Sequence, residues 1–202
     1  MSVPQDPASL ATTIALASGA PAIVRHLAPG DRAQLGDYFA GLSAETRRRF
    51  GPHALDHATA DALCAALDPA RVLRIVALAR EGGSEAVIAY VILMLSVTAA
   101  ETERYARRGI VLDGATDCTL APSVADAYQG QGLGSQVLRH VFRLARGLGR
   151  TRVVLLGGTQ ATNARAIHYY RKHGFEDCGG FEAPAGVWNI DMAADLGAAG
   201  EA

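Results

Sequence analysis

A glycine-rich segment carries the clearest chemical signal in the sequence. Residues 129–134 read Gln-Gly-Gln-Gly-Leu-Gly, between an apolar run and a helical pattern from Leu133 to Leu148. Glycine lets a ligand approach the backbone closely, because no Cβ stands in the way. The first N–H groups of a helix have no internal acceptor and lie at the positive end of the helix dipole. The pattern therefore predicts a phosphate or pyrophosphate site, although a glycine-rich strand-to-helix connection without a ligand would look the same.

The spacing of these glycines excludes two common phosphate-binding motifs. A dinucleotide-binding loop needs G-x-G-x-x-G, and no glycine occupies the third position here. A Walker loop needs Lys and then Ser or Thr after its second glycine, where this chain has Ser135-Gln136. The segment instead fits Q/R-x-x-G-x-G through Gln129, Gly132 and Gly134. This spacing resembles the acyl-CoA pyrophosphate loop of the GNAT N-acetyltransferase superfamily.

A second segment resembles the helix and strand that follow in the same superfamily. It fits N-x-x-A-x-x-x-Y-x-x-x-G-F from Asn163 through Tyr170 to Phe175. Helical spacing places Asn163 and Tyr170 on one side of a helix that Gly174 ends. Taken singly, Asn163 could be a helix cap and Tyr170 a core residue. The glycine segment and a strand expected over 153–156 precede them at the spacing usual in the superfamily. The two motifs together therefore argue against a chance match.

The resemblance implies that acyl-CoA, most often acetyl-CoA, binds between the strand before the glycine segment and the strand after it. Its pantetheine arm is expected to pair with the backbone of Val124 and Ala125, much as an added strand would. The other residues expected to contact the cofactor are Gln129, Gly130, Gln131, Gly132, Leu133, Gly134, Ser135, Asn163 and Tyr170. No metal is expected.

Acyl transfer to an amine needs a base, a hydrogen-bond donor for the oxyanion and an acid for the leaving thiolate. The family takes the oxyanion donor from a backbone N–H of the strand before the loop, and Tyr170 matches the position of the acid. The protein-lysine acetyltransferase branch has a glutamate at or near the position of Thr119. We expect Asp117, two residues away on the same strand face, to act as the base through an ordered water, unless it is a solvated strand-edge residue. Further candidates are Glu101, Glu103 and His168, while Asp126 is expected to cap or turn the chain.

The stretch Leu42–Phe50 resembles the L-S-x-E-[ST]-x-x-R-F segment of the same branch, which includes bacterial protein-lysine acetyltransferases. We expect transfer of an acetyl group from acetyl-CoA to a primary amine, of a protein lysine or a small molecule, by direct attack in a ternary complex. The alternative is a catalytically weak acyl-CoA-binding sensor or protein-interaction module, because the strand glutamate is missing.

Composition excludes several other classes. The chain has 202 residues, 50% of them hydrophobic, and a formal net charge of −1, so it should fold without affinity for nucleic acid or anionic membranes. Three widely spaced cysteines argue against a disulfide framework or zinc site and suit the cytoplasm. Arginines at 47–49, 104 and 107–108 are expected on solvated faces, or against the 3′-phosphate of CoA. A homodimer is compatible with the sequence.

The order of the expected elements predicts an α/β (α+β) fold of GNAT type. Its mixed, mostly antiparallel sheet of about seven strands has helices on both faces. We expect a flexible leader over 1–21, one N-acyltransferase domain over 22–192 and a frayed tail over 193–202. The polar, arginine-rich stretch 99–114 is expected to be a surface loop.

Overall fold

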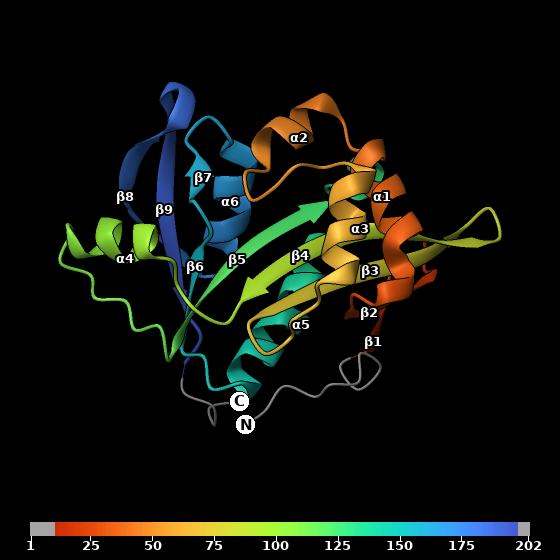
Figure 1. The fold of residues 1–202 in the computed structure, drawn as a ribbon, viewed down its shortest axis with the longest axis horizontal. Coiled ribbons are helices and arrows are strands. Elements are labelled where there is room, and N and C mark those ends of the chain that lie inside the picture. The colour runs from red at the N-terminus through yellow and green to blue at the C-terminus, as the bar shows by residue number, and fades with distance from the viewer. Residues whose placement is uncertain (1–10, 198–202) are drawn as a thin grey trace.

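A nine-stranded sheet runs through the chain, and helices cover both of its faces (Figure 1). The computed structural model describes residues 11–197. The strands lie in the order β1-β2-β3-β4-β5-β6-β9-β7, and β8 pairs with β9. Their bounds are β1 (Thr12–Ala15), β2 (Pro21–His26), β3 (Val72–Glu81), β4 (Ser84–Met94), β5 (Asp117–Val124), β6 (Arg152–Leu155), β7 (Thr159–Gln160), β8 (Phe175–Ala183) and β9 (Val187–Asp195). Among these strands β5 and β6 pair in parallel, and the other pairs are antiparallel.

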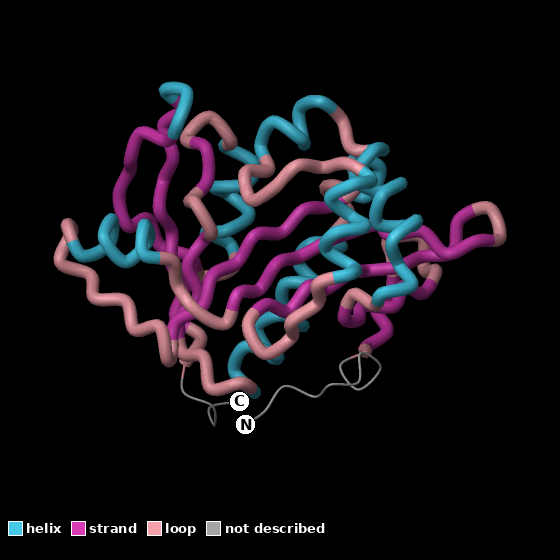
Figure 2. The backbone as a smooth tube through the Cα atoms, in the orientation of Figure 1, coloured by secondary structure: helices cyan, strands magenta, loops and turns pink. Residues whose placement is uncertain are grey.

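The helices pack on the two faces of this one twisted layer of strands (Figure 2). They are α1 (Arg32–Gly41), α2 (Ala44–Arg49), α3 (His57–Ala65), α4 (Ala99–Ala106), α5 (Leu133–Gly147) and α6 (Ala164–Lys172), with short 3₁₀ segments η2 (Pro29–Asp31), η3 (Asp126–Tyr128) and η4 (Pro184–Gly186). Helices α1 and α3 share one hydrophobic core with one face of the sheet, and α5 shares another core with the opposite face. The predicted mixed, mostly antiparallel α/β fold is confirmed.

The two cores explain why β3 and β4 are apolar almost without interruption. Successive side chains of a strand point to opposite faces of the sheet. On β3, Ile75 and Ala77 therefore enter the core beneath α5, whereas Val76 and Leu78 enter the core beneath α1 and α3. A strand covered on both faces needs apolar residues at every position, so its sequence does not alternate.

Both ends of the described chain continue the sheet where the sequence indicated leader and tail. Thr12–Ala15 forms β1 and pairs with β2, so the expectation of a flexible leader is wrong there. β9 runs to Asp195, and Leu196 is buried, so the expected frayed tail begins as part of the fold. β1 and the two-residue β7 raise the number of strands from the expected seven to nine. The remaining parts of both expectations, residues 1–10 and 198–202, lie outside the described residues.

The stretch expected as a surface loop at 99–114 begins with a helix, α4. Thr98 accepts a hydrogen bond from the Glu101 N–H, and the Glu101 carboxylate accepts one from the Thr98 N–H at 2.9 Å. This reciprocal pair is a capping box, and its S/T-x-x-E signature stands in the sequence. The low apolar content of α4 concealed it, because Tyr105 is the one large apolar side chain that the helix buries.

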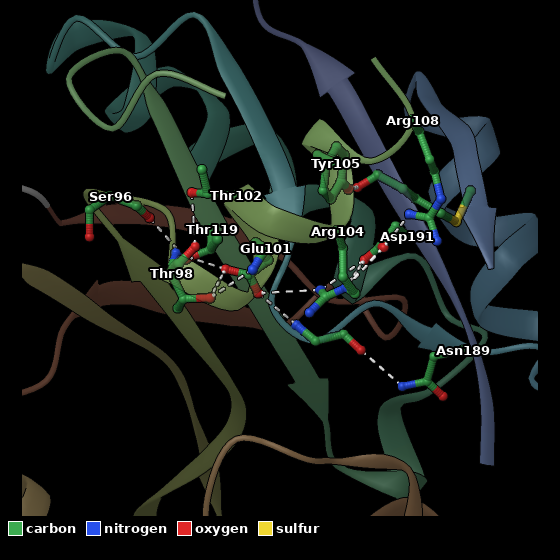
Figure 3. Close-up of polar contacts among 12 residues, drawn as sticks. Ser96, Thr98, Glu101, Thr102, Arg104, Tyr105, Arg108, Thr119, Asn189 and Asp191 are labelled. Atoms are coloured by element: carbon green, nitrogen blue, oxygen red, sulfur yellow. Dashed lines mark hydrogen bonds and ion pairs between the residues drawn. The ribbon is translucent and has the colours of Figure 1, made fainter. Parts of the chain in front are cut away.

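A network of buried charges fastens α4 to the end of the sheet (Figure 3). Asp191 of β9 is fully buried and receives Arg104 at 2.9 Å and Arg108 at 2.7 Å. Arg104 also lies over the ring of Phe181, 4.0 Å from its centroid. The expectation of solvated faces is therefore wrong for Arg104 and Arg108, which hold a buried carboxylate. Arg47 is likewise structural, because it donates to three backbone carbonyls around α2.

Replacing Asp191 with alanine leaves two arginines in this site without their carboxylate. Removing one partner of a buried ion pair costs about 3–5 kcal/mol, so we expect Asp191→Ala to lower the free energy of unfolding by about that amount. Arg107→Ala is the control, because the exposed Arg107–Glu103 pair should contribute less than about 1 kcal/mol. Urea denaturation followed by circular dichroism measures both, and equal losses would contradict the proposed importance of the buried network.

Candidate active site

A cleft opens where β5 and β6 part. The parallel ladder between them ends at Leu120↔Leu155, and the Leu156 N–H adds a last bond to the Leu120 carbonyl at 2.9 Å. Residues 121–124 still pair with β4, but no described strand pairs with their other edge. The cleft that results has a volume of about 770 Å³, and its walls come from β5, α2, α6 and the glycine segment.

A pair of glycines turns the chain away from β5 at the end of β6. Gly157 and Gly158 have φ of 69° and 67°, a region that side chains with a Cβ rarely adopt. A Cβ on Gly158 would also lie 2.7 Å from the Ile190 carbonyl oxygen. The peptide groups of Gly157 are fixed on both sides, since its N–H donates to Glu101 and its carbonyl accepts from Asn189, each at 2.9 Å (Figure 3). The turn leads into β7, which pairs with β9 and so keeps the second strand away from the first.

The glycine segment forms one end of the cleft. Gly130 and Gly132 have φ of 76° and 84°, and Gly132 is the N-cap of α5 without a side-chain hydrogen bond. The first N–H groups of α5 therefore lack a capping side chain, and they lie at the positive end of the helix. Gly130, Gly132, Gly134 and Ser135 line the cleft, as do the cationic Arg165 and Lys172 of α6. This end of the cleft suits an anionic group such as a pyrophosphate.

The C-terminal half of α6 supports the first turn of α5. The Tyr169 hydroxyl donates to the Gly134 carbonyl at 2.8 Å, and a Cβ on Gly134 would meet the Tyr169 ring at 3.4 Å. Ser135 Oγ and His173 Nε2 lie 2.8 Å apart. Burial lowers the pKa of His173, and neighbouring cations lower it further. The imidazole is therefore mostly neutral at pH 7, and its Nε2 shares one proton with the Ser135 hydroxyl.

Asp126 ties α2 to the strand that precedes the glycine segment. Its carboxylate accepts from the Ser43 N–H at 2.9 Å, from Ser43 Oγ at 2.8 Å and from Thr46 Oγ1 at 2.7 Å. Burial alone would raise the pKa of the Asp126 carboxyl, but these hydrogen bonds bring it below its ordinary value. The residue thus takes the turn and capping role indicated by the sequence, although it caps the distant helix α2.

Gln129 links three elements at the mouth of the cleft. Its Nε2 donates to the Val124 carbonyl at 2.8 Å and to Thr46 Oγ1 at 3.3 Å, and its Oε1 accepts from Arg165 at 2.6 Å. β5, α2 and α6 are therefore joined through one side chain. The loop conformation that exposes the glycines depends on these three contacts.

Tyr170 lies on the wall that α6 contributes. Its ring packs against Tyr169 and Phe175 at centroid distances of 5.4 and 5.2 Å. The side chain is nearly buried and lines the cleft, and its hydroxyl makes no hydrogen bond with any described residue. Burial raises the pKa of Tyr170, so the phenol stays protonated and can donate. Asn163, about two helical turns before Tyr170, caps α6 by accepting from the Ala166 N–H at 3.2 Å and also lines the cleft.

The model of the acetyltransferase (GNAT) family matches residues 44–175, more than half of the chain and all of the elements around the cleft. The chain belongs to this family. Membership confirms the resemblance drawn from the glycine segment and from residues 163–175, and it makes the protein an acetyl-CoA-dependent N-acetyltransferase.

Solved structures with the same fold include three informative ones. The GNAT domain of S. lividans PAT is 23% identical with a TM-score of 0.72, over 95% of this chain and 99% of that one. AAC(6')-Ib with paromomycin and acetyl-CoA is 20% identical with a TM-score of 0.63, over 86% and 93%. The putative acetyltransferase yncA from Salmonella typhimurium, with its cofactor acetyl-CoA, is 18% identical with a TM-score of 0.60, over 86% and 93%. A search of curated protein sequences finds no match to the chain.

The structure does not bring Asp117 to the GNAT cleft. Asp117 is buried at the far end of β5, where its carboxylate accepts from the Asp113 N–H at 2.8 Å and lies 3.7 Å from Arg152. The part of β5 that lines the cleft begins at Leu120. Thr119, at the family's glutamate position, is buried and donates to the Ser96 carbonyl at 3.1 Å. The geometry therefore argues against Asp117 as the base, because its carboxylate is engaged at the end of β5 that does not line the cleft.

Three residues expected at the cofactor do not line the cleft. Ala125 uses its N–H to donate to the Ile88 carbonyl, so it has turned back toward β4. Gln131 donates its side chain to the Ala127 carbonyl, and Leu133 is buried in the core beneath α5. Glycines at every second position face the cleft, and the residues between them face away. The expected residues that do line it are Val124, Gln129, Gly130, Gly132, Gly134, Ser135, Asn163 and Tyr170.

Of the other candidate bases, His168 lines the cleft. Glu101 is buried under the turn after β6, and Glu103 pairs with Arg107 on the surface. Glu45 of α2 lines the cleft and pairs with Arg49 at 2.7 Å. Sequence reasoning missed Glu45 and Arg49 as site residues, although the L-S-x-E motif that contains Glu45 was the available signal.

Among residues 11–197 no group of three His, Cys, Asp or Glu side chains could hold a metal ion. No helix of the same described part is both long and apolar enough to cross a membrane.

Asp126→Ala should loosen α2 from the cleft, because it removes three hydrogen bonds to that helix. We expect a stability loss of about 1 kcal/mol, typical of a lost cap, and faster amide hydrogen exchange over 42–49. Asp56→Ala is the control, because Asp56 caps α3 through the Thr59 N–H at 2.7 Å and does not line the cleft. It should lose similar stability without faster exchange in α2. Unchanged exchange in Asp126→Ala would show that α2 is held by packing alone.

Proposed function

We propose that this GNAT enzyme transfers an acetyl group from acetyl-CoA to a primary amine by direct attack in a ternary complex. One observation carries the proposal. The edge of β5 that has no described strand partner after Leu120 leads directly into the glycine segment and the uncapped N-terminus of α5. The edge offers a partner for an extended pantetheine arm, and the helix start offers N–H groups for a pyrophosphate. The same cleft holds both features, so one extended thioester substrate would satisfy them together.

The residues of the cleft divide between the two parts of such a substrate. The pyrophosphate would be bound by backbone N–H groups around Gly132 and Ser135, with Arg165 and Lys172 adding positive charge. The arm would lie along Pro122 and Val124 of β5. Its thioester end would then lie toward Leu120, where the ladder with β6 ends and where a nucleophile must reach the acyl carbon.

Tyr170 is the proposed acid for the leaving thiolate. Its hydroxyl is protonated and has no partner among the described residues, so it can donate when negative charge develops on sulfur. Because direct transfer passes the acyl group straight to the amine, no covalent cysteine is needed. Cys118 is buried outside the cleft and suits a packing role.

The acceptor is a primary amine of a protein lysine or of a small molecule. AAC(6')-Ib, which has the same fold, is an aminoglycoside acetyltransferase and binds kanamycin, an amine of the second kind. An ammonium with a pKa near ~10.4 must lose its proton before attack. His168 and Glu45 are two groups on the cleft wall that could receive it, directly or through water. The free thiols of Cys64, Cys118 and Cys178 suit a cytoplasmic enzyme.

The second candidate is a catalytically weak protein that binds acyl-CoA and reports its presence. The buried Thr119, in place of a strand carboxylate, favours this candidate. A screen of amine acceptors with acetyl-CoA, in which released thiol is measured, separates the two functions. Turnover supports the transferase, and saturable binding of CoA without turnover supports the sensor.

CoA should stabilise the wild-type protein, because it binds the native state alone. At a concentration 100 times Kd the gain is about 2.7 kcal/mol, which should raise Tm by roughly 5–10 °C in a chain of this size. Gly132→Val and Gly134→Val should abolish the rise, because a side chain would fill the space beside the N–H groups. Gly149→Val is a matched control for Gly132→Val, since Gly149 also has a positive φ, 74°, and open surroundings but lies away from the cleft. If CoA still raised the Tm of both cleft variants, the pyrophosphate could not be bound by this glycine segment.

Tyr170→Phe should lower kcat by at least about 10²-fold, the usual scale of acid catalysis, while leaving the Kd of CoA nearly unchanged. The hydroxyl is needed when the thiolate leaves and not when the substrate binds. Tyr169→Phe is the comparison, because it removes the bond to Gly134 and should weaken CoA binding instead. Steady-state kinetics and calorimetry measure the two effects. Equal turnover in wild type and Tyr170→Phe would leave Tyr170 with a packing role.

A further inference from the structure

One backbone position on the cleft side of β5 has no hydrogen-bond donor. Backbone groups point alternately to the two sides of a strand. The Leu120 carbonyl accepts from Leu156 after β6, whereas the Ala125 N–H donates to Ile88 on β4. Leu120 and every second residue after it therefore direct their backbone groups toward the cleft. The residue two positions after Leu120 is Pro122, which has a carbonyl but no N–H.

The position of Pro122 in the sheet agrees with this orientation. Proline is tolerated in a strand where its nitrogen faces away from a paired neighbour. Pro122 lies opposite Val91 of β4, between the hydrogen-bonded positions Ala121 and Ser123. Its nitrogen points instead to the side where β6 has already parted from β5. The proline therefore costs the sheet no hydrogen bond with β4. The N–H that it lacks would have pointed into the cleft.

Neighbouring N–H groups cannot replace the missing donor, because they are already engaged. At the inner end of the cleft, the Leu156 N–H donates to Leu120 and the Gly157 N–H donates to Glu101. The Gly158 N–H donates to Leu155 at 3.1 Å. On the outer side the next donor of β5 is the Val124 N–H, one strand repeat nearer to the pyrophosphate site. None of the three inner N–H groups is therefore free to donate in place of the N–H that Pro122 lacks.

We propose that Pro122 withholds a backbone hydrogen bond from the acyl carbonyl, so that residue 122 limits the rate of acyl transfer in this enzyme. The inference rests on the proposed function, in which the thioester end lies along β5 toward Leu120, beside Pro122. When the amine attacks, its lone pair forms the C–N bond and the carbonyl π electrons move onto oxygen. That oxyanion is stabilised by a preorganised donor, and one such donor is worth about 10²–10³ in rate. The bound acyl-CoA of the wild-type protein consequently reacts slowly and persists.

The direct test is the carbonyl vibration of bound acetyl-CoA labelled with ¹³C at the thioester carbonyl, recorded by isotope-edited infrared difference spectroscopy. A hydrogen bond moves this band to lower wavenumber. We expect the wild-type band to lie above that of acetyl-CoA in water, and Pro122→Ala, which adds an N–H, to move it down. Pro52→Ala is the control, because Pro52 lines the cleft but lies outside the sheet. A wild-type band already below that in water, or a band that Pro122→Ala leaves in place, overturns the inference.

The kinetic test measures thiol release with a panel of amines and with water as acceptor. Pro122→Ala should raise kcat at least about tenfold, because it supplies a donor of a kind that is worth about 10²–10³ in rate. Pro122→Val, which suits a strand, replaces the alanine variant if the latter does not fold, and the wild-type spectrum alone decides the question if neither folds. Unchanged kcat in a folded variant overturns the inference. Failure of acetyl-CoA to bind the wild-type protein contradicts the proposed function instead.

Discussion

The parting of β5 and β6 after a short parallel ladder is the constraint on which the rest of the site depends. A sheet that continued to pair would fill its own edge, and no backbone groups would remain for a ligand. The separation is maintained from the side of β6, because two left-handed glycines turn that strand toward β7 and β9. Glu101 and Asn189 hold the turn through the N–H and carbonyl of Gly157. The buried pairing of Asp191 with Arg104 and Arg108 fixes α4, and through it Glu101, against the same region.

On the other side of the cleft, hydrogen bonds of polar side chains, and not strand pairing, hold the neighbouring elements together. Asp126 and Gln129 connect α2, α6 and the end of β5 through hydrogen bonds that cross the mouth of the cleft. The hydrogen bonds of Asp126 and of Arg165 are exposed, so each contributes modest energy. The two sides of the cleft therefore differ in kind. The turn after β6 is backed by the buried ion pairs of Asp191, whereas α2 is held by surface hydrogen bonds that can exchange with water.

The sequence predicted those parts of the fold and site that depend on local chemistry. The glycine spacing, the uncapped helix start, the capping role of Asn163 and the placement of Tyr170 follow from residue type and helical periodicity, and the structure contains all of them. The position of Asp117 could not be inferred, because a strand face says nothing about which end of the strand the cleft occupies. The burial of Arg104 and Arg108 could not be inferred either, since their partner Asp191 lies over eighty residues away. The prediction for α4 failed for another reason. Its capping box at Thr98 and Glu101 can be recognised in the sequence, but the polar composition of the segment favoured a loop.

The pairing of β9 with β6, β7 and β8 has a consequence for the order of assembly. β9 is the last of the described strands to be synthesised, yet it supports the turn after β6 and carries Asp191. The core beneath α1 and α3 can collapse while β9 is still inside the ribosome, because its strands and helices come earlier in the chain. The turn after β6, which lines the cleft at Gly158, cannot reach its final position before β9 is present, because Asn189 of β9 holds it. During synthesis the nascent protein is therefore expected to pass through a state with a folded N-terminal half and no acyl-CoA site, and competence for the ligand appears as the final step of folding.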